Sequence, residues 1–437
     1  MVRTFLEELS HCLSIAYSLL LVCIVLASGS AIHDSTAAQS LIETLAVVAL
    51  ALVGARASAI DVSLSARCTK GLKIAAAIPA VVMLIQILPV PIGAHSIWIN
   101  ANEALGRQSW GHISVDLGGT ILALAYYLAN ISLILVSVFV TRERRRAELL
   151  LFALTLMATL TTLGLLVGKL GLNLDSSNND VLSGISALGI LLAIANIART
   201  FETHQSDRET AEERNAKSAL IAGGIGLLIG VIGLIVGATS NAALTIIFAT
   251  AFFGSIEVLR RTGLAGWATG ILLTTFITAA AMIIVWRYDA SRALSPLLQF
   301  ATASSPDAIS VTQRLLSDTP WFGTGAGTFT SISPLYLELD SQVRQAPSTI
   351  AEITIALGWP MTVFLLGATI WLVIVLFRGA LSRGRDAFYP AAAAAGTVLL
   401  LGQAFCDPSL LNTCVAVFGD ALIGLGLAQS VSGRDRI

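Results

Sequence analysis

Charged residues are scarce in this sequence. Asp, Glu, Lys and Arg make up only 12% of its 437 residues, whereas soluble domains contain about 25%. Hydrophobic residues account for 55%, and the mean hydropathy is +0.82. This composition excludes a soluble globular chain and predicts a polytopic membrane protein of the all-α class.

Paired cysteines and metal-binding motifs are also lacking. The five cysteines include no CxxC pair, which argues against both a disulfide framework and a zinc site. Cys406 and Cys414 lie near one membrane face and are able to pair, but two unpaired thiols are the expected arrangement. The long polar segment 287–349 has no DxD-type metal motif and no histidine. We therefore expect neither a metal nor another cofactor.

Long hydrophobic runs dominate what is present. A bilayer core about 30 Å thick needs roughly 20 apolar residues per helix. We predict twelve transmembrane helices, at 12–29, 40–55, 72–89, 118–140, 147–168, 180–198, 217–237, 241–258, 265–286, 350–377, 389–405 and 409–430.

The basic residues support this count. With the N-terminus in the cytoplasm, 20 of the 26 Lys and Arg residues fall on the cytoplasmic side and six on the other. Cytoplasmic loops of membrane proteins carry such an excess, and one missed helix would scramble the alternation. Both termini are therefore expected in the cytoplasm.

One external segment is far longer than the others. Residues 287–349 separate a nine-helix membrane region, 1–286, from a three-helix membrane region, 350–437. The segment contains the glycine-rich stretch SDTPWFGTGAGTFTSISPLY, residues 317–336. A long polar loop in an otherwise apolar chain is the natural place to look for an active site.

This stretch and two further segments resemble one protein family. DTPWFGTGAGTF (318–329) resembles the hPlfGvGpGtF box of the O-antigen ligase and polymerase superfamily. APSTIAEITIALGWP (346–360) is similar to the family's AHNdylelltElGlpG, and LIQILPVPIGAHSIW (84–98) is similar to its lQliPLPpsiw. In that family the glycine box also lies in a large periplasmic loop between helices nine and ten of twelve.

The resemblance implies an activity. Members are metal-independent glycosyltransferases with a GT-C-like, all-helical membrane fold, and they take a glycan from an undecaprenyl-pyrophosphate carrier at the periplasmic face. Ligases transfer it to lipid A core, and polymerases transfer it to another carrier-linked unit. The expected protein is a surface-polysaccharide or exopolysaccharide polymerase, or a ligase, of the bacterial inner membrane. Its implied partners are the lipid-linked donor, a glycan or lipid-core acceptor, membrane lipids and other polysaccharide export proteins, with no nucleic acid.

Arginines in the long loop suit this chemistry. Negative charge develops on the leaving diphosphate, and a guanidinium matches two phosphate oxygens at once. Arg314 is the first candidate, because ten residues separate it from Gly325, as in the Arg-x10-Gly pattern of O-antigen polymerase loops. The other diphosphate-binding candidates are Arg287, Arg344 and Arg292. Ion pairs with nearby acids, or headgroup anchoring, explain each arginine equally well.

The acceptor hydroxyl needs a general base, and the histidine of the family's AHN box is replaced here by Pro347. Carboxylates serve as bases when they reach the hydroxyl. The catalytic candidates are therefore Glu352, Glu338 and Asp340. Glu352 lies about one turn into the tenth predicted helix, where a solvated helix start is an equally good explanation.

The glycines and aromatic residues of the loop have two interpretations each. Gly323, Gly325 and Gly327 permit positive φ angles, which bring backbone N–H groups close to a ligand. Tight turns explain the same glycines and are favoured. Trp321 and Phe322 either stack on sugar rings or bury the loop in the membrane surface.

Two other function classes stay open. GATSNAAL (237–244) is similar to the family's lTgSRgall, but Asn241 stands where the family has arginine. Either another arginine replaces it, or this branch works differently, or the protein is not catalytic. With the missing histidine, this departure keeps open a non-catalytic scaffold of a polysaccharide assembly complex. A transporter or lipid-linked oligosaccharide flippase suits twelve helices, although the two halves of the chain do not match.

Overall fold

The long apolar runs form helices, because a helix satisfies its own backbone hydrogen bonds and presents only side chains to lipid. The computed structural model describes residues 2–33, 35–56, 59–89, 94–106, 110–171, 177–206, 210–237, 240–262, 274–276, 278, 282, 295–301, 306–337, 343, 345–382 and 386–430. No strand occurs among these residues. The all-α class predicted from the sequence is confirmed.

Eleven long helices and six short ones make up the described structure. The long helices are α1 (Val2–Ile32), α2 (Thr36–Arg56), α3 (Ala59–Ile87), α5 (Leu117–Val140), α6 (Arg144–Gly171), α7 (Ser177–Ser206), α8 (Thr210–Gly237), α9 (Ser240–Thr262), α14 (Trp359–Ser382), α15 (Phe388–Cys406) and α16 (Thr413–Ser430). The short ones are α4 (Ser96–Leu105), α11 (Pro306–Asp318), α12 (Phe329–Ile332), η1 (Ser333–Tyr336), α13 (Thr349–Leu357) and η2 (Ser409–Leu411).

Ten of the long helices in the described part are long and apolar enough to cross a membrane, and each overlaps a predicted span. They are α1, α2, α5 to α9 and α14 to α16. The third predicted span, 72–89, coincides with a shorter apolar helix, Gly71–Ile87. Most of the ninth, 265–286, lies outside the described residues. The protein is thus of the multi-pass membrane type, and the total of twelve spans stays a prediction.

The tenth predicted span, 350–377, is wrong at its start. The helix breaks at Gly358, which has a φ of +86°, and α14, a candidate membrane span, begins only at Trp359. A Cβ at Gly358 would collide with the carbonyl oxygen of Trp321 in the glycine-rich loop. The break therefore depends on a contact with a distant segment, which the apolar run itself does not reveal.

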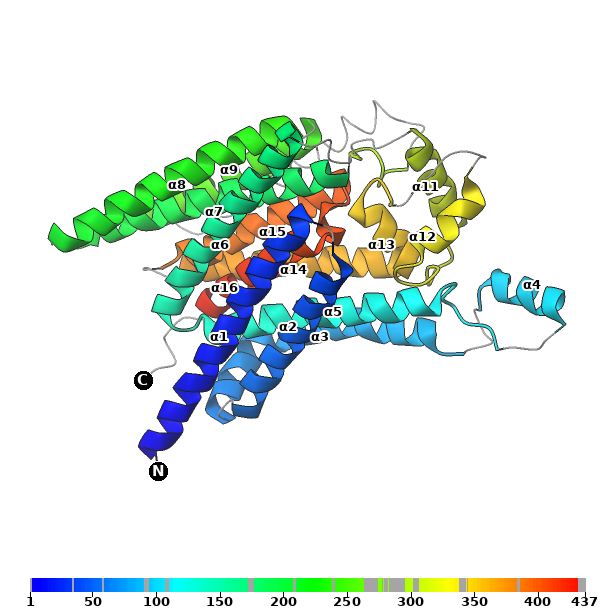
Figure 1. Cartoon of the computed structure of the whole chain (residues 1–437), viewed down its shortest axis with the longest axis horizontal. Helices are drawn as coiled ribbons and strands as arrows, with labels where there is room; N and C mark the ends of the chain where they lie inside the picture. The colour runs from blue at the N-terminus through cyan, green and yellow to red at the C-terminus, as the bar shows by residue number, and fades with distance from the viewer. Residues whose placement is uncertain are drawn as a thin grey trace.

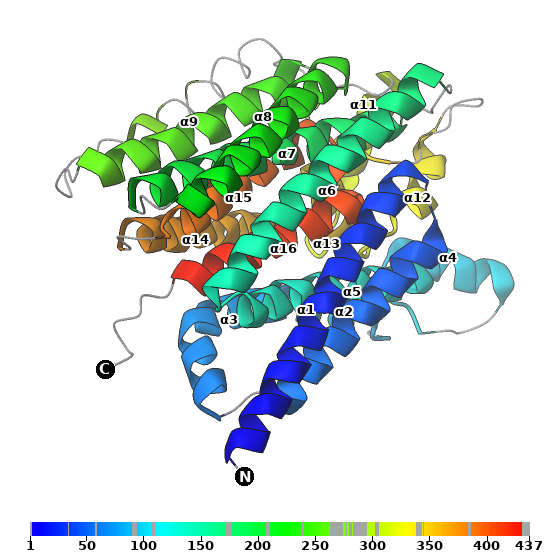
Figure 2. The same cartoon turned by 60° about the vertical axis from the view of Figure 1, so that its left-hand side comes forward.

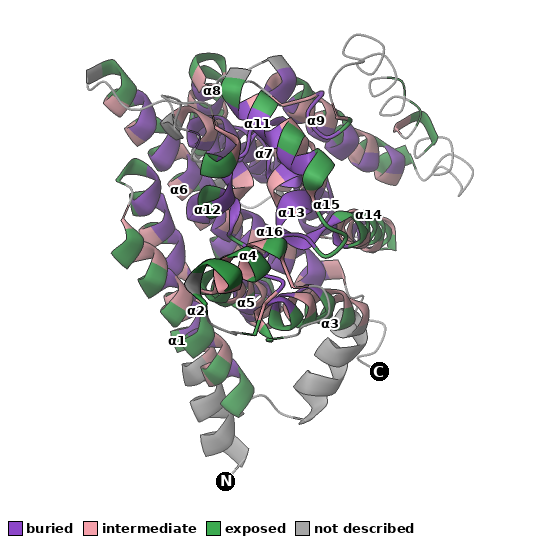
Figure 3. Cartoon of the chain, turned by 90° about the vertical axis from the view of Figure 1, so that its right-hand side faces the viewer, coloured by how far each residue is buried: buried purple, intermediate pink, exposed green. Residues whose placement is uncertain are grey.

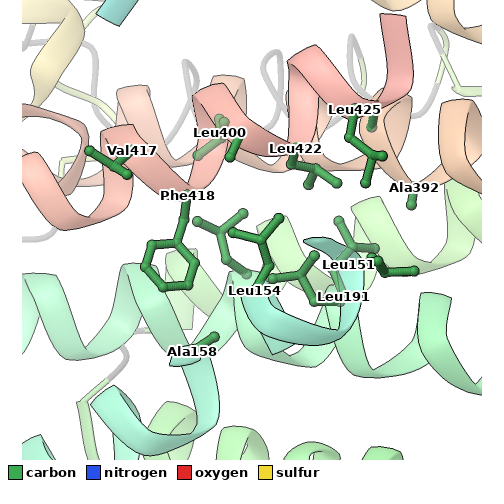
Figure 4. Packing of buried hydrophobic residues seen from close by; sticks show 14 of the residues in the cluster. Leu151, Leu154, Ala158, Leu191, Ala392, Leu400, Val417, Phe418, Leu422 and Leu425 are labelled. Carbon is green, nitrogen blue, oxygen red and sulfur yellow. The ribbon is translucent and has the colours of Figure 1, made fainter. Parts of the chain in front are cut away.

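The centre of the bundle is formed by α15 and α16 against α6 and α7. Figure 4 shows Leu154 of α6 beside Phe418 of α16, with Leu191 of α7 in the same buried cluster. In α15, the five consecutive alanines 391–395 are all buried. Small side chains let helices approach closely. In a lipid bilayer the hydrophobic effect does not drive helices together, so the van der Waals contacts of this close packing hold them in place.

Glycines let α8 approach its neighbours in the same way. A Cβ would come within 2.9 Å of the Thr159 side chain at Gly226, and within 2.8 Å of the Ile190 side chain at Gly230. These glycines are four positions apart and share one face of α8. The two helices α7 and α8 accordingly lie side by side along their length (Figure 2).

The short helices α4, α11, α12 and α13 gather at one end of the bundle, called the loop end below (Figure 1, right). The beginning of α1 and the end of α16 lie on the other side (Figure 1). Ion pairs occur on that other side: Arg199 lies 2.8 Å and Arg144 lies 3.1 Å from the Glu148 carboxylate. This is the side to which the sequence assigned most basic residues, and its facing the cytoplasm stays a prediction.

Candidate functional site

Three segments that are far apart in the sequence meet at the loop end. They are the end of α3, the glycine-rich loop 320–328 and the end of α13. The Gln86 carboxamide, only 1% exposed, joins them. Its Nε2 donates to Phe322 O (2.8 Å) and to Ala356 O (2.9 Å), and its Oε1 accepts from Ala326 N (3.2 Å). The three segments that carry the family resemblance are thus in direct contact.

Three glycines shape the loop. Gly323, Gly325 and Gly327 have φ angles of +71°, +111° and +71°, a region that glycine adopts without strain. A Cβ at Gly325 would lie 2.5 Å from Ser114 Oγ, and a Cβ at Gly327 would lie 2.8 Å from Gly119 O. The positive φ angles are confirmed, and the close backbone approach that they permit is to other parts of the protein.

Backbone N–H groups of this loop are used inside the protein. The donor–acceptor pairs are Gly323 N–Pro320 O (3.0 Å), Thr324 N–Ile355 O (2.9 Å), Gly325 N–Ala356 O (3.0 Å) and Ala326 N–Gln86 Oε1 (3.2 Å). An N–H that already donates to a protein oxygen is not available to a diphosphate. Of the two interpretations of the glycines, the tight turn accounts for these contacts.

The segment between α3 and α5 packs against the same junction. Val115 N donates to Thr324 O (2.9 Å). Farther out, His95 N donates to His112 O (2.9 Å), and His95 Nδ1 accepts from the first turn of α4. Burial lowers the pKa of His95. Through these hydrogen bonds, the two histidines stabilise the segment that carries the exposed α4 (Figure 3).

Glu352 is partly buried in α13, outside the candidate membrane spans. Ser348 caps this helix, and Thr349 N donates to Asp407 O (3.1 Å) at the end of α15. Burial raises the pKa of Glu352 to about 7, opposed by the Ala346 N–H that bonds to the carboxylate. Its Oε2 is buried and has no hydrogen-bond partner in the described structure. Such a carboxyl group exchanges its proton near neutral pH, as a general base must.

The raised pKa of Glu352 predicts a pH-dependent stability. Because the folded pKa of about 7 exceeds the ordinary value of 4.5, the folded state binds the proton more tightly than the unfolded chain. The stabilisation of the folded state by this group is fully present below pH 4.5. As the pH rises to about 7, the free energy of unfolding falls by roughly 3 kcal/mol. Glu352→Gln should remove this loss, so its melting temperature in detergent should exceed that of the wild type at pH 8.

Asp307→Asn is the matched control, since Asp307 is an exposed acid on the nearby α11. It should follow the wild-type pH profile. Asp407, whose pKa burial raises to about 6, contributes equally to all three proteins. A Glu352→Gln profile parallel to that of the wild type between pH 5 and 8 would contradict the prediction.

The structure does not bring Arg314 to Glu352. The apolar face of α11, with Val311 and Leu315, packs in one buried cluster with Ile355 of α13. Arg314 lies on the opposite, exposed face of α11. The remaining candidates Arg287, Arg292, Arg344, Glu338 and Asp340 lie outside the described residues, and their roles stay predictions.

Three further residues that the sequence singled out are buried. Asn241, at the position where the resemblance leads us to expect arginine, is 7% exposed and donates from Nδ2 to Phe300 O (2.9 Å). It thereby ties α9 to the segment 295–301. Cys406 and Cys414 are both buried and are not joined by a disulfide, as expected.

Sequence reasoning gave Gln86 no role, although the structure places it at the centre of the site. The available signal was a single amide within the apolar run LIQILPV. A buried polar side chain needs hydrogen-bond partners, so a lone glutamine near the end of an apolar helix predicts a polar contact. The identity of the partner, 236 residues away in the case of Phe322, is visible only in the fold.

Comparison with known proteins adds no identification. The chain matches no family model and no characterised protein. A functional assignment therefore rests on the chemistry of the loop end and on the resemblance of three short segments.

Proposed function

We propose that this chain is a metal-independent glycosyltransferase that acts at the outer face of a bacterial inner membrane. It polymerises or ligates glycans carried on undecaprenyl pyrophosphate, and an exopolysaccharide or surface-polysaccharide polymerase is the favoured form. One observation carries the proposal: the three family-like segments share the buried Gln86 carboxamide. If the three segments matched the family motifs only by chance, there would be no reason for all three to contact the same hydrogen-bonded residue.

The proposed reaction is a displacement at the anomeric carbon of the carrier-linked sugar. The acceptor hydroxyl oxygen forms the new glycosidic bond, its proton passes to the Glu352 carboxylate, and the bond from sugar to diphosphate breaks. The enclosed Oε2 and the pKa of about 7 suit this role. The arginines of the 287–349 loop stabilise the charge that develops on the diphosphate. Among them, Arg314 is exposed on the outer face of α11.

Complementation of a deletion strain tests the assignment. Wild-type protein should restore full-length polysaccharide on a gel. Glu352→Gln and Arg314→Ala, made at normal levels, should leave single repeat units or none, and the ladder distinguishes a polymerase from a ligase. Ser310→Ala changes the same exposed face of α11 and should behave as wild type. Full-length polymer from both Glu352→Gln and Arg314→Ala would refute this mechanism and favour transport or scaffolding.

A non-catalytic scaffold is the second candidate, and three observations favour it. Four N–H groups of the loop are used internally, Asn241 replaces an expected arginine, and Arg314 lies on the exposed face of α11. A scaffold needs the shape of the loop end but not its acid–base chemistry. It therefore predicts that Glu352→Gln restores polymer fully, whereas a variant that disrupts the junction at Gln86 does not.

A further inference from the structure

Two large aromatic side chains stand uncovered at the tip of the glycine-rich loop. Trp321 is 77% exposed and Phe322 is 64% exposed. Their backbone, by contrast, is tightly held: Phe322 O accepts from Gln86 Nε2 at 2.8 Å, and Trp321 O lies against Gly358 so closely that no Cβ would fit there. The protein thus fixes the position of these side chains without covering them.

The two fixing residues set the level of the tip relative to the membrane. Gln86 is one residue from the end of the apolar helix Gly71–Ile87, and Gly358 immediately precedes Trp359, the first residue of a candidate span. The tip therefore lies where two apolar helices end. In a bilayer with a core about 30 Å thick, this level is the boundary between acyl chains and headgroups, where tryptophan is enriched.

We propose that Trp321 and Phe322, together with Trp359, form an aromatic anchor inserted into the lipid leaflet at the loop end. Trp359 is itself 39% exposed, and Leu88, just beyond the end of α3, is 53% exposed, so the apolar surface continues around the tip. Two carbonyl groups beside the rings are already occupied, since Pro320 O accepts from Gly323 N and Phe322 O from Gln86. A sugar stacked on these rings would therefore have fewer carbonyl groups available as hydrogen-bond acceptors, whereas acyl chains need no hydrogen bonds.

The anchor holds the loop at a defined height on the membrane, and it does not depend on the proposed enzymatic activity. Each side chain protrudes from a backbone that is hydrogen-bonded or sterically fixed to the outer ends of α3 and α14. Movement of the loop away from the membrane would therefore have to break contacts of both helices.

Depth-dependent fluorescence quenching tests the anchor. Trp321→Cys, labelled with bimane and reconstituted into phosphatidylcholine vesicles, should lose fluorescence when the acyl chains carry bromine near their headgroup end. Ser310→Cys, on the exposed polar face of α11, should be quenched by aqueous iodide instead. Labelled wild-type protein gives the background from the five native cysteines. Trp321→Phe provides a second readout, since it should remove part of the intrinsic fluorescence that brominated lipid quenches.

The proposal is overturned if bimane at position 321 is quenched by iodide as strongly as bimane at position 310 and is insensitive to brominated lipid. It is also overturned if a soluble polysaccharide, and not the lipid, shields position 321 from iodide, because the tip would then be a glycan platform. Complementation of the deletion strain is scored separately, so failure of the anchor and failure of the glycosyltransferase assignment are distinguishable.

Discussion

Replacing Gln86 by alanine should open the loop end while leaving the helical bundle intact. Ala326 N loses its acceptor, Phe322 O loses a donor, and Ala356 O keeps the bond from Gly325 N. A buried orphan N–H costs about 1–3 kcal/mol and each lost bond about 1 kcal/mol, and the cavity adds to this. We expect a total of about 3–5 kcal/mol. The measurement is hydrogen–deuterium exchange of peptides that cover 320–328 and 350–358, where uptake should rise.

Two variants make this test specific. Gln86→Glu keeps an oxygen for Ala326 N but faces the carbonyls of Phe322 and Ala356 with a second acceptor, so it should be at least as damaging at neutral pH. Gln345→Ala removes an exposed glutamine of the same loop and should leave exchange unchanged. Unaltered uptake at 320–328 in Gln86→Ala would mean that the carboxamide does not hold the three segments together.

Adding one methyl group at Gly323 should destabilise the protein almost as much. Its φ of +71° costs a side-chain-bearing residue about 1–2 kcal/mol. The new Cβ would also collide with the Ala356 carbonyl oxygen and lie 2.7 Å from Gly358 N. These are backbone atoms, so relief requires the loop to separate from α13. Gly323→Ala should therefore lower the melting temperature in detergent and increase protease cleavage within the loop.

Gly367→Ala is the matched control, because a Cβ at this position in α14 meets no atom within 4 Å. Alanine is favoured over glycine in a helix by up to about 1 kcal/mol, so this variant should melt at or above the wild-type temperature. If Gly323→Ala melts as Gly367→Ala does, the loop tolerates a side chain at this position and the close backbone contact is not needed for stability.

The candidate site was only partly foreseeable from the sequence. Gly323, Gly325 and Gly327 predict positive φ angles, because glycine adopts such angles without the strain that a side chain would cause. The glycines do not predict whether their N–H groups donate to a ligand or to the protein, since that depends on which protein carbonyl groups the fold brings close to them. Arg314 was selected by its spacing from Gly325, but the face it occupies on α11 depends on which side of that helix packs in the buried cluster. Neither property is encoded locally.

By itself, the sequence determined that the chain is an all-helical, multi-pass membrane protein and where nearly all of its apolar helices run. These features follow from local physics: about 20 consecutive apolar residues suffice to cross a bilayer whatever lies elsewhere in the chain. Only the tertiary structure decided that α13 ends at Leu357, that the Oε2 atom of Glu352 is buried, and that Gln86 joins three distant segments. Each of these depends on a neighbour hundreds or tens of residues away, because burial and hydrogen bonding are properties of atoms in contact and not of residues in order.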